Sequence, residues 1–190
     1  MNIFVLDSSP VLAAQYQCDK HVVKMIVESA QMLSTAHRLL DGVQSEESRI
    51  NKSGKTRNVK VWRLNDSELD AKLYGVTHRG HPSTLWTMES MANYIWHYEH
   101  FCALCDEYTF RYGKKHKTDA KLRFVLDASP QNIPDIAQTQ FRLAMKSQPQ
   151  CINPDDPIAS YRAFYQTKQG RFKMVWSKRS KPDWFTVSNT

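Results

Sequence analysis

The chain has 190 residues, the usual size of one domain built on one hydrophobic core. Hydrophobic residues make up 41% of it and aromatic residues 11%, with only 6 Gly and 8 Pro, and this composition excludes extensive disorder and low-complexity repeats. The formal net charge is +7, because 26 Lys and Arg outnumber 19 Asp and Glu. We therefore predict a single compact domain, residues 1–190, with a basic surface.

The first part of the chain predicts a long helix. Residues 2–7 are a short apolar stretch that suits a strand or an extended arm, and Pro10 after two serines suits a first helical turn. Helical periodicity continues to about Leu40, with a bend possible near Cys18, and Asp41-Gly42 ends it.

The segment that follows is polar. Residues 43–58 lack apolar periodicity, so we expect a mobile insertion loop there. A short helix is expected at 65–74, and a second long helix from Ser83 to Tyr112, ended by Gly113.

The last third has fewer regular elements. Residues 128–154 contain several prolines and predict irregular connecting chain, a third helix is expected at 155–169, and the carboxy-terminal region after it is irregular. The predicted class is mainly α, with two long helices.

The sequence contains no segment that is typical of a secretory signal or of a membrane span. Apolar runs stay far below the roughly 20 residues of a membrane span, and residues 1–7 lack the basic start and long apolar stretch of a secretory signal. We expect a cytoplasmic monomer without a membrane partner.

The cysteines and histidines do not form a metal-binding pattern. Cys102 and Cys105 form a C-x-x-C inside a helical stretch with no second pair, so four free thiols are expected, with Cys18 and Cys151. The histidines between 78 and 100 lack a convincing acidic partner. We expect neither a metal nor a cofactor.

Polar side chains share one stripe of the first long helix. His21, Lys24 and Glu28 follow at spacings of 3 and 4, and Arg38 continues the stripe. An imidazole, an amine and a carboxylate could converge there, with Glu28 as a general acid or base. The alternative interpretation is an ordinary solvated helix face.

Basic side chains concentrate near the second helix end and in the last 30 residues, interleaved with aromatic rings. Cations that neutralise phosphates and rings that stack on bases suit nucleic acid, while a merely soluble basic surface is the alternative. His81 before Pro82 could bind an anion at a helix start, or simply cap that helix. The residues expected to contact DNA are Arg38, His81, Arg111, Lys114, Lys115, Lys117, Lys178, Arg179, Lys181, Trp184 and Phe185.

Three segments together resemble the bacteriophage-type pyrimidine-dimer DNA glycosylase family. Asp19-Lys20-His21 with Glu28 is similar to that family's D-x-H segment and downstream glutamate. The segment from Ser83 to Arg111 is similar in length and ending to its second long helix, and Lys181-Pro182-Asp183-Trp184-Phe185 resembles its carboxy-terminal DNA-contacting segment.

The resemblance implies a helical enzyme that binds duplex DNA and opens the stack around a damaged base. In the family an amino-terminal amine attacks the sugar C1′ and one glutamate assists; Glu28 matches that glutamate and His21 the family's histidine. Asn2 stands where the family has a threonine exposed by methionine removal, so Lys24 is a second candidate amine.

The sequence leaves several functions open. The first is a DNA N-glycosylase, with or without AP-lyase activity, acting on a damaged or modified pyrimidine. The second is a DNA-base modifying transferase on the same scaffold, and the third a non-catalytic DNA-binding protein. An RNA or nucleotide substrate is the remaining alternative.

Overall fold

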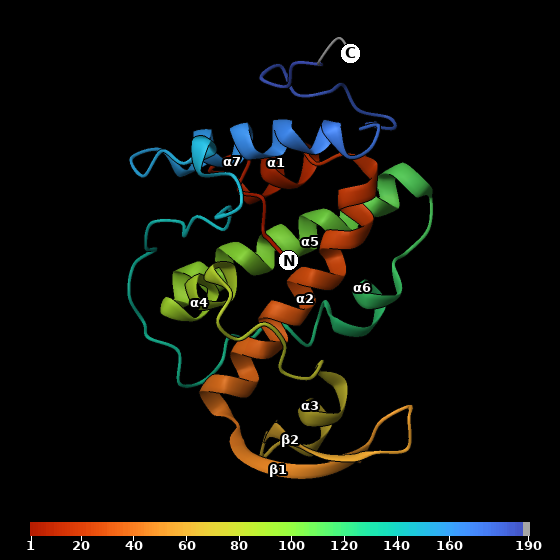
Figure 1. The fold of residues 1–190 in the computed structure, drawn as a ribbon, viewed down its shortest axis with the longest axis vertical. Helices are drawn as coiled ribbons and strands as arrows, with labels where there is room; N and C mark the ends of the chain where they lie inside the picture. The colour runs from red at the N-terminus through yellow and green to blue at the C-terminus, as the bar shows by residue number, and fades with distance from the viewer. Residues whose placement is uncertain (188–190) are drawn as a thin grey trace.

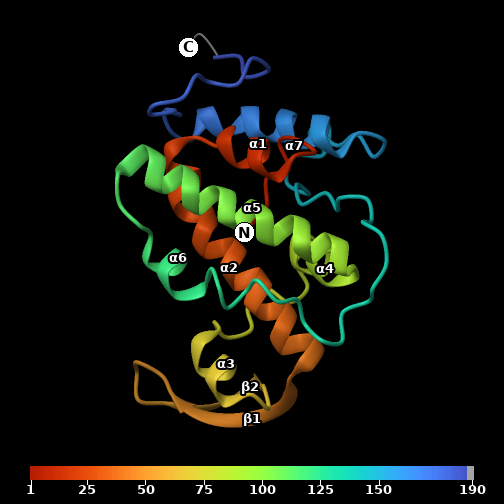
Figure 2. The same ribbon diagram turned by 180° about the vertical axis from the view of Figure 1, so that it is seen from behind.

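The computed structural model describes residues 1–187, and these are mainly helical (Figures 1 and 2). The elements follow in the order α1 (Pro10–Gln15), α2 (Asp19–Asp41), β1 (Val43–Ile50), β2 (Thr56–Arg63), α3 (Ser67–Lys72), α4 (Pro82–Glu89), α5 (Met91–Tyr112), α6 (Lys117–Leu122), η1 (Pro149–Cys151), α7 (Pro157–Gln166) and η2 (Thr167–Gly170). The short helix and the third helix that we expected are present but shorter, and α6 was not predicted. Residues 2–7 form an extended arm and no strand.

The first predicted long helix is divided into α1 and α2. The break lies at the expected position, and its backbone groups find partners elsewhere in the fold. Arg111 donates to the carbonyls of Gln15 and Gln17 over 3.0 and 2.9 Å, and the indole of Trp176 donates to the Tyr16 carbonyl over 2.8 Å. These donors replace the hydrogen bonds that a continuous helix would have made.

The second predicted long helix is also divided, at Ser90. This residue has an extended backbone (φ −152°, ψ 156°), and its hydroxyl accepts from the Asn93 N–H and so caps α5. The Asn93 side chain donates to the last turn of α4, at the Trp86 carbonyl, over 2.7 Å. A polar side chain therefore joins the two helices across the break.

The core lies where α2 and α5 cross, with α1 and α4 packed against them (Figure 1). α2 has an apolar face that includes Val22, Met25, Ile26 and Leu33, all buried. α7 lies across one end of the helical body and the β1–β2 hairpin lies at the other (Figures 1 and 2).

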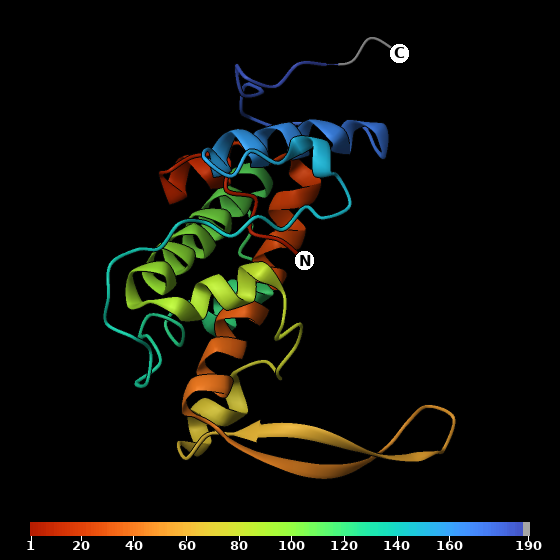
Figure 3. The ribbon, with the colours of Figure 1, turned by 60° about the vertical axis from the view of Figure 1, so that its left-hand side comes forward.

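Residues 43–58 do not form the loop that we predicted, because they belong to an antiparallel hairpin. β1 pairs with β2 in a register that runs from Val43↔Arg63 to Ile50↔Thr56. The Asn51 side chain accepts from the Ser53 and Lys55 N–H groups in the turn. The hairpin projects from the helical body (Figure 3) and both its faces are largely exposed, so it lacks the apolar alternation that identifies a half-buried strand.

The carboxy-terminal chain after η2 has no regular element up to residue 187, yet it is tied to the start of α2. The Asp19 carboxylate accepts from both the N–H and the hydroxyl of Ser177, over 2.9 and 2.6 Å, and the Val175 carbonyl accepts from the Asp19 N–H. These bonds bring residues 171–177 alongside the helix that carries His21 and Glu28.

Two further observations concern the helices and thiols. None of the helices within residues 1–187 is both long and apolar enough to cross a membrane. The four cysteines, all within the described residues, are free thiols, and Cys18, Cys105 and Cys151 are buried.

Candidate active site

The amino terminus of the chain meets the carboxylate of Glu28. The Met1 amino nitrogen lies 3.6 Å from Glu28 Oε2, and the Asn2 N–H donates to the same oxygen over 3.1 Å. Lys24 Nζ lies 3.0 Å from Oε1. The Glu28 side chain is only 13% exposed, so its charge is balanced by two cations within a largely desolvated site.

The Asn2 side chain holds the arm in this position. Its Oδ1 accepts from the N–H groups of Ile3 and Phe4, and its Nδ2 donates to the Ala144 carbonyl over 3.1 Å. Phe4 has a positive φ of 54°, a conformation that few side chains adopt readily, and its ring is buried. The chain thus turns sharply at the site and fixes the amino terminus beside α2.

We call the cavity in front of this carboxylate the N-terminal pocket, and it has a volume of about 270 Å³. It is lined by Met1, Asn2, Phe4, His21, Lys24, Met25, Glu28, Ala144, Phe164, Lys168, Arg171 and Phe172. These residues come from the amino-terminal arm, α2, the irregular chain before η1, α7, η2 and the chain that follows. The pocket contains the α-amine, two lysines and an arginine against one carboxylate, so it suits an anionic substrate.

His21 is a neutral imidazole at physiological pH. Its Nδ1 lies 2.7 Å from the Tyr165 hydroxyl, and burial, with smaller contributions from the charges of Lys24 and Lys168, lowers its pKa to about 4. The Tyr165 oxygen accepts from the Cys18 N–H, so its own proton is free for Nδ1.

Lys168 belongs to the site but sequence reasoning missed it. Its Nζ lies 3.5 Å from the centroid of the Phe164 ring, and the residue is 9% exposed. Burial, followed by repulsion from Arg171, lowers the pKa of Lys168 to about 8. A fraction of this amine is unprotonated near neutral pH, as a lysine nucleophile requires. The one sequence signal was the i, i+4 spacing from Phe164.

His81 approaches the same site from the loop before α4. Its Nδ1 accepts from the Ser83 N–H, so it caps α4, and it also has a hydrogen bond with the backbone of Met1. Burial lowers the pKa of His81, and the nearby α-amine adds to that effect. The structure therefore places His81 with Glu28 and shows the capping role that we gave as its alternative.

Arg38 and Arg111 are not available for DNA contacts, which corrects both interpretations. Arg38 is 5% exposed, and its guanidinium donates to Asp70 and to the carbonyls of Trp62, Leu73 and Tyr74. Arg111 is buried, and apart from the two carbonyls at the α1–α2 break its guanidinium pairs with Asp19 and Glu107. Both guanidinium groups link separate segments of the fold.

The aromatic pair near the carboxy terminus also differs from the expectation. Phe185 is 2% exposed and packs edge-on against Trp176, so its assignment to base contacts is corrected to a core position. Trp184 is half-buried between Tyr16 and Tyr165, and its indole nitrogen is enclosed. The buried Phe185 ring therefore presents no open face for a base to stack on.

The other basic residues expected to contact DNA lie at the surface. Lys114, Lys115 and Lys117 are exposed around the start of α6. Three more are exposed but have internal partners: Lys178 donates to the Phe110 carbonyl, Arg179 to Glu107, and Lys181 to the Phe185 carbonyl. None of these six lines the N-terminal pocket.

Within residues 1–187, no group of three or more His, Cys, Asp or Glu is arranged to hold a metal ion. Comparisons with models of protein families, with curated proteins and with solved structures found no match to this chain. The arrangement itself supports two kinds of chemistry: nucleophilic attack by an amine, and proton transfer by the carboxylate beside it.

Proposed function

We propose that this protein is a DNA base-excision enzyme, an N-glycosylase with or without AP-lyase activity, that acts on a damaged or modified pyrimidine in duplex DNA. The observation that carries the proposal is the meeting of the chain's amino terminus with Glu28 in a cationic pocket. The resemblance of the segment around His21 and Glu28 to the pyrimidine-dimer DNA glycosylase family also supports it.

The chemistry requires an amine and a proton acceptor at one sugar. The amine nitrogen forms a bond to C1′ as the bond from C1′ to the base breaks, and the base leaves with the electron pair and gains a proton. The attacking nitrogen then loses a proton and forms a double bond to C1′ as the C1′–O4′ bond breaks; O4′ leaves with that electron pair and gains a proton, which gives an imine to the ring-opened sugar. Glu28, 3.1 to 3.6 Å from the backbone nitrogens of residues 1 and 2, is the group that moves these protons.

The geometry serves either form of the amino terminus. With Met1 retained, its α-amine is the nucleophile, 3.6 Å from the carboxylate. With Met1 removed, the nitrogen of Asn2 becomes the α-amine, and this atom already lies 3.1 Å from Glu28. The intact mass of the purified protein decides between the two.

Borohydride trapping tests the proposal. Duplexes that contain an abasic site, a thymine dimer or a modified pyrimidine are incubated with the protein and reduced, and a covalent protein–DNA adduct is the expected result. Acetylation of the α-amine should abolish the adduct. An adduct that survives acetylation but is lost in Lys168→Ala or Lys24→Ala would move the nucleophile to that lysine.

Three outcomes contradict the proposal. An intact strand with an altered base mass and no adduct indicates a transferase. Tight binding with unchanged DNA indicates a non-catalytic DNA-binding protein. Reaction with RNA or free nucleotides in place of duplex DNA would change the substrate class.

A further inference from the structure

The β1–β2 hairpin extends beyond the helical body and has no helix packed over its distal half (Figure 3). An isolated two-stranded ribbon is marginally stable and presents unpaired edges to its surroundings. Figure 3 shows that it projects toward the side of the view on which the amino terminus lies. The hairpin is therefore an arm that extends clear of the helical body.

The charges of the arm are asymmetric along its length. Its two acids, Glu46 and Glu47, lie in the half nearer the body. The charged residues within 49–57 are all cations: Arg49, Lys52, Lys55 and Arg57. The register places Arg49 directly opposite Arg57. Arg49 pairs with Glu47 of its own strand over 3.0 Å, whereas among the described residues no carboxylate pairs with Arg57, so Arg57 is the member of this pair whose charge is available to an anion.

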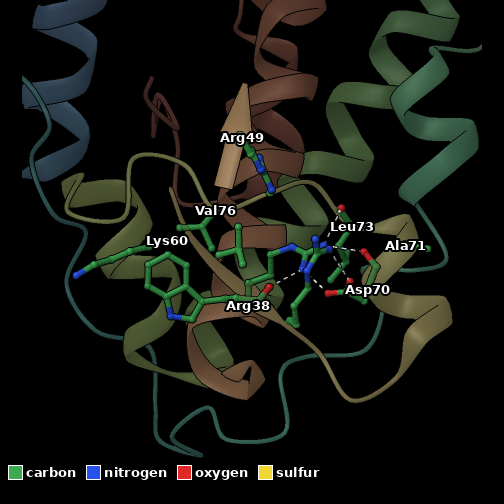
Figure 4. A pocket seen from close by; sticks show the side chains of 11 residues that line it. Arg38, Arg49, Lys60, Asp70, Ala71, Leu73 and Val76 are labelled. Atoms are coloured by element: carbon green, nitrogen blue, oxygen red, sulfur yellow. Dashed lines mark hydrogen bonds and ion pairs between the residues drawn. The ribbon is translucent and has the colours of Figure 1, made fainter. Parts of the chain in front are cut away.

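A groove lies at the base of the arm, between the hairpin and residues 73–76. It has a volume of about 400 Å³, and its lining includes Arg49, Lys60, Trp62 and Val76. Figure 4 shows Arg38 bonded within the protein, while the Lys60 side chain extends away from that cluster. Among the described residues no carboxylate pairs with Lys60 or with Arg57.

We propose that this arm and its groove bind the phosphate backbone of duplex DNA, as a second contact apart from the N-terminal pocket. The inference rests on the DNA binding in the proposed function and is independent of its chemistry. Cations on an extended ribbon fit a linear polyanion. An anionic membrane surface fits less well, because residues 51–55 at the tip include no apolar side chain to insert between lipids.

Charge substitutions at exposed hairpin positions test the inference. Arg57→Gln with Lys60→Gln removes two cations, and Glu46→Gln, at the position opposite Lys60, is the control of opposite sign. The affinity for a duplex of about 20 base pairs is measured against salt concentration, and binding to vesicles of anionic phospholipid is measured in parallel. Circular dichroism checks that each variant is folded.

The double variant should bind DNA roughly tenfold more weakly at 0.1 M salt for each phosphate that no longer has a cation beside it, and its log–log salt slope should be shallower by about 2. Glu46→Gln should bind more tightly than the wild-type protein. Wild-type affinity and slope in both variants would overturn the inference, as would a charge effect seen on vesicles and not on DNA.

The two proposals fail separately. If the double variant binds DNA with wild-type affinity and still forms the adduct, the arm has no role in binding, and the base-excision proposal stands. Hairpin-dependent binding by a protein that neither forms an adduct nor releases a base would support the arm and refute the base-excision chemistry.

Discussion

The Asn2 N–H donates a hydrogen bond to Glu28 over 3.1 Å and so joins two residues 26 positions apart in the chain. The contact places the first peptide unit of the chain against the middle of α2, where Lys24 approaches the other carboxylate oxygen. The Glu28 side chain is only 13% exposed, so the two amines balance a carboxylate that is largely removed from water.

Glu28→Gln should abolish most of the activity and little of the binding. The amide retains the size of the side chain but cannot accept a proton, so turnover on any DNA substrate of the wild-type protein should fall by roughly 10² or more. Single-turnover rates and DNA affinity are the measurements. Glu99→Gln, at an exposed position on α5, is the matched control and should have wild-type rates. Unchanged turnover in Glu28→Gln would refute the catalytic role.

Acid should destabilise the protein in a window defined by His21. The folded pKa of about 4 is below the ordinary value of 6.5, so the unfolded state binds more protons between these values. The stability contributed by neutral His21 is complete above pH 6.5 and is lost as the pH falls toward 4. Urea unfolding across this range should give a smaller pH slope for His21→Gln. An identical slope in both proteins would mean that folding does not lower the pKa of His21.

Lys168 should make the stability of the protein depend on pH in the alkaline range as well, and in the same direction as His21 does in acid. Its folded pKa of about 8 is below 10.5, so the unfolded state binds more protons between these values and stability should rise as the pH increases from 8 to 10.5. Lys168→Met should lack that rise. The pH dependence of reductive methylation, read by mass spectrometry, gives the pKa of Lys168 directly. A modification profile centred near 10.5 would contradict a desolvated amine.

Phe185→Ala should weaken the fold and leave DNA recognition unchanged. The ring is buried against Trp176, and removing a buried phenylalanine costs about 3–5 kcal/mol. Urea unfolding measures the loss, and the salt slope of DNA binding should stay at its wild-type value. A stable variant with a specific defect in binding damaged DNA would restore the role in base contact that the sequence suggested.

The exposed lysines near α6 should contribute phosphate contacts if DNA extends over that surface. Replacing Lys114, Lys115 and Lys117 with Gln should make the salt slope shallower by about 1 for each lysine that meets a phosphate and weaken binding to all sequences equally. Fold stability should change little, because these side chains are solvent-exposed. A wild-type slope would show that the DNA does not reach α6.

Helical periodicity was enough to predict part of the site. The spacing of His21, Lys24 and Glu28 places them on one face of a helix in any environment, so this stripe could be derived before the fold was known. The mainly α class followed from the same periodicity. A bend near Cys18 was also expected, whereas the break at Ser90 was not, because the backbone partner of Met91, the carbonyl of Pro134, lies far away in the chain.

The hairpin could not be predicted from the hydrophobic pattern of the sequence. A strand is recognised by apolar alternation when one of its faces is buried, and the distal part of this hairpin buries neither face. Its sequence is polar, as the sequence of a loop is, so the strands can be identified only from the cross-strand hydrogen bonds in the structure.

The sequence by itself determined the helical class, the basic charge and the polar stripe of α2. The tertiary structure alone decided which parts of that stripe face a pocket and which face the interior. Glu28 and Arg38 share the stripe, yet one meets the amino terminus in an open pocket while the other is enclosed by α3 and β2. The reason is physical: helix periodicity depends on neighbouring residues, whereas burial depends on the packing free energy of segments that are far apart in the chain.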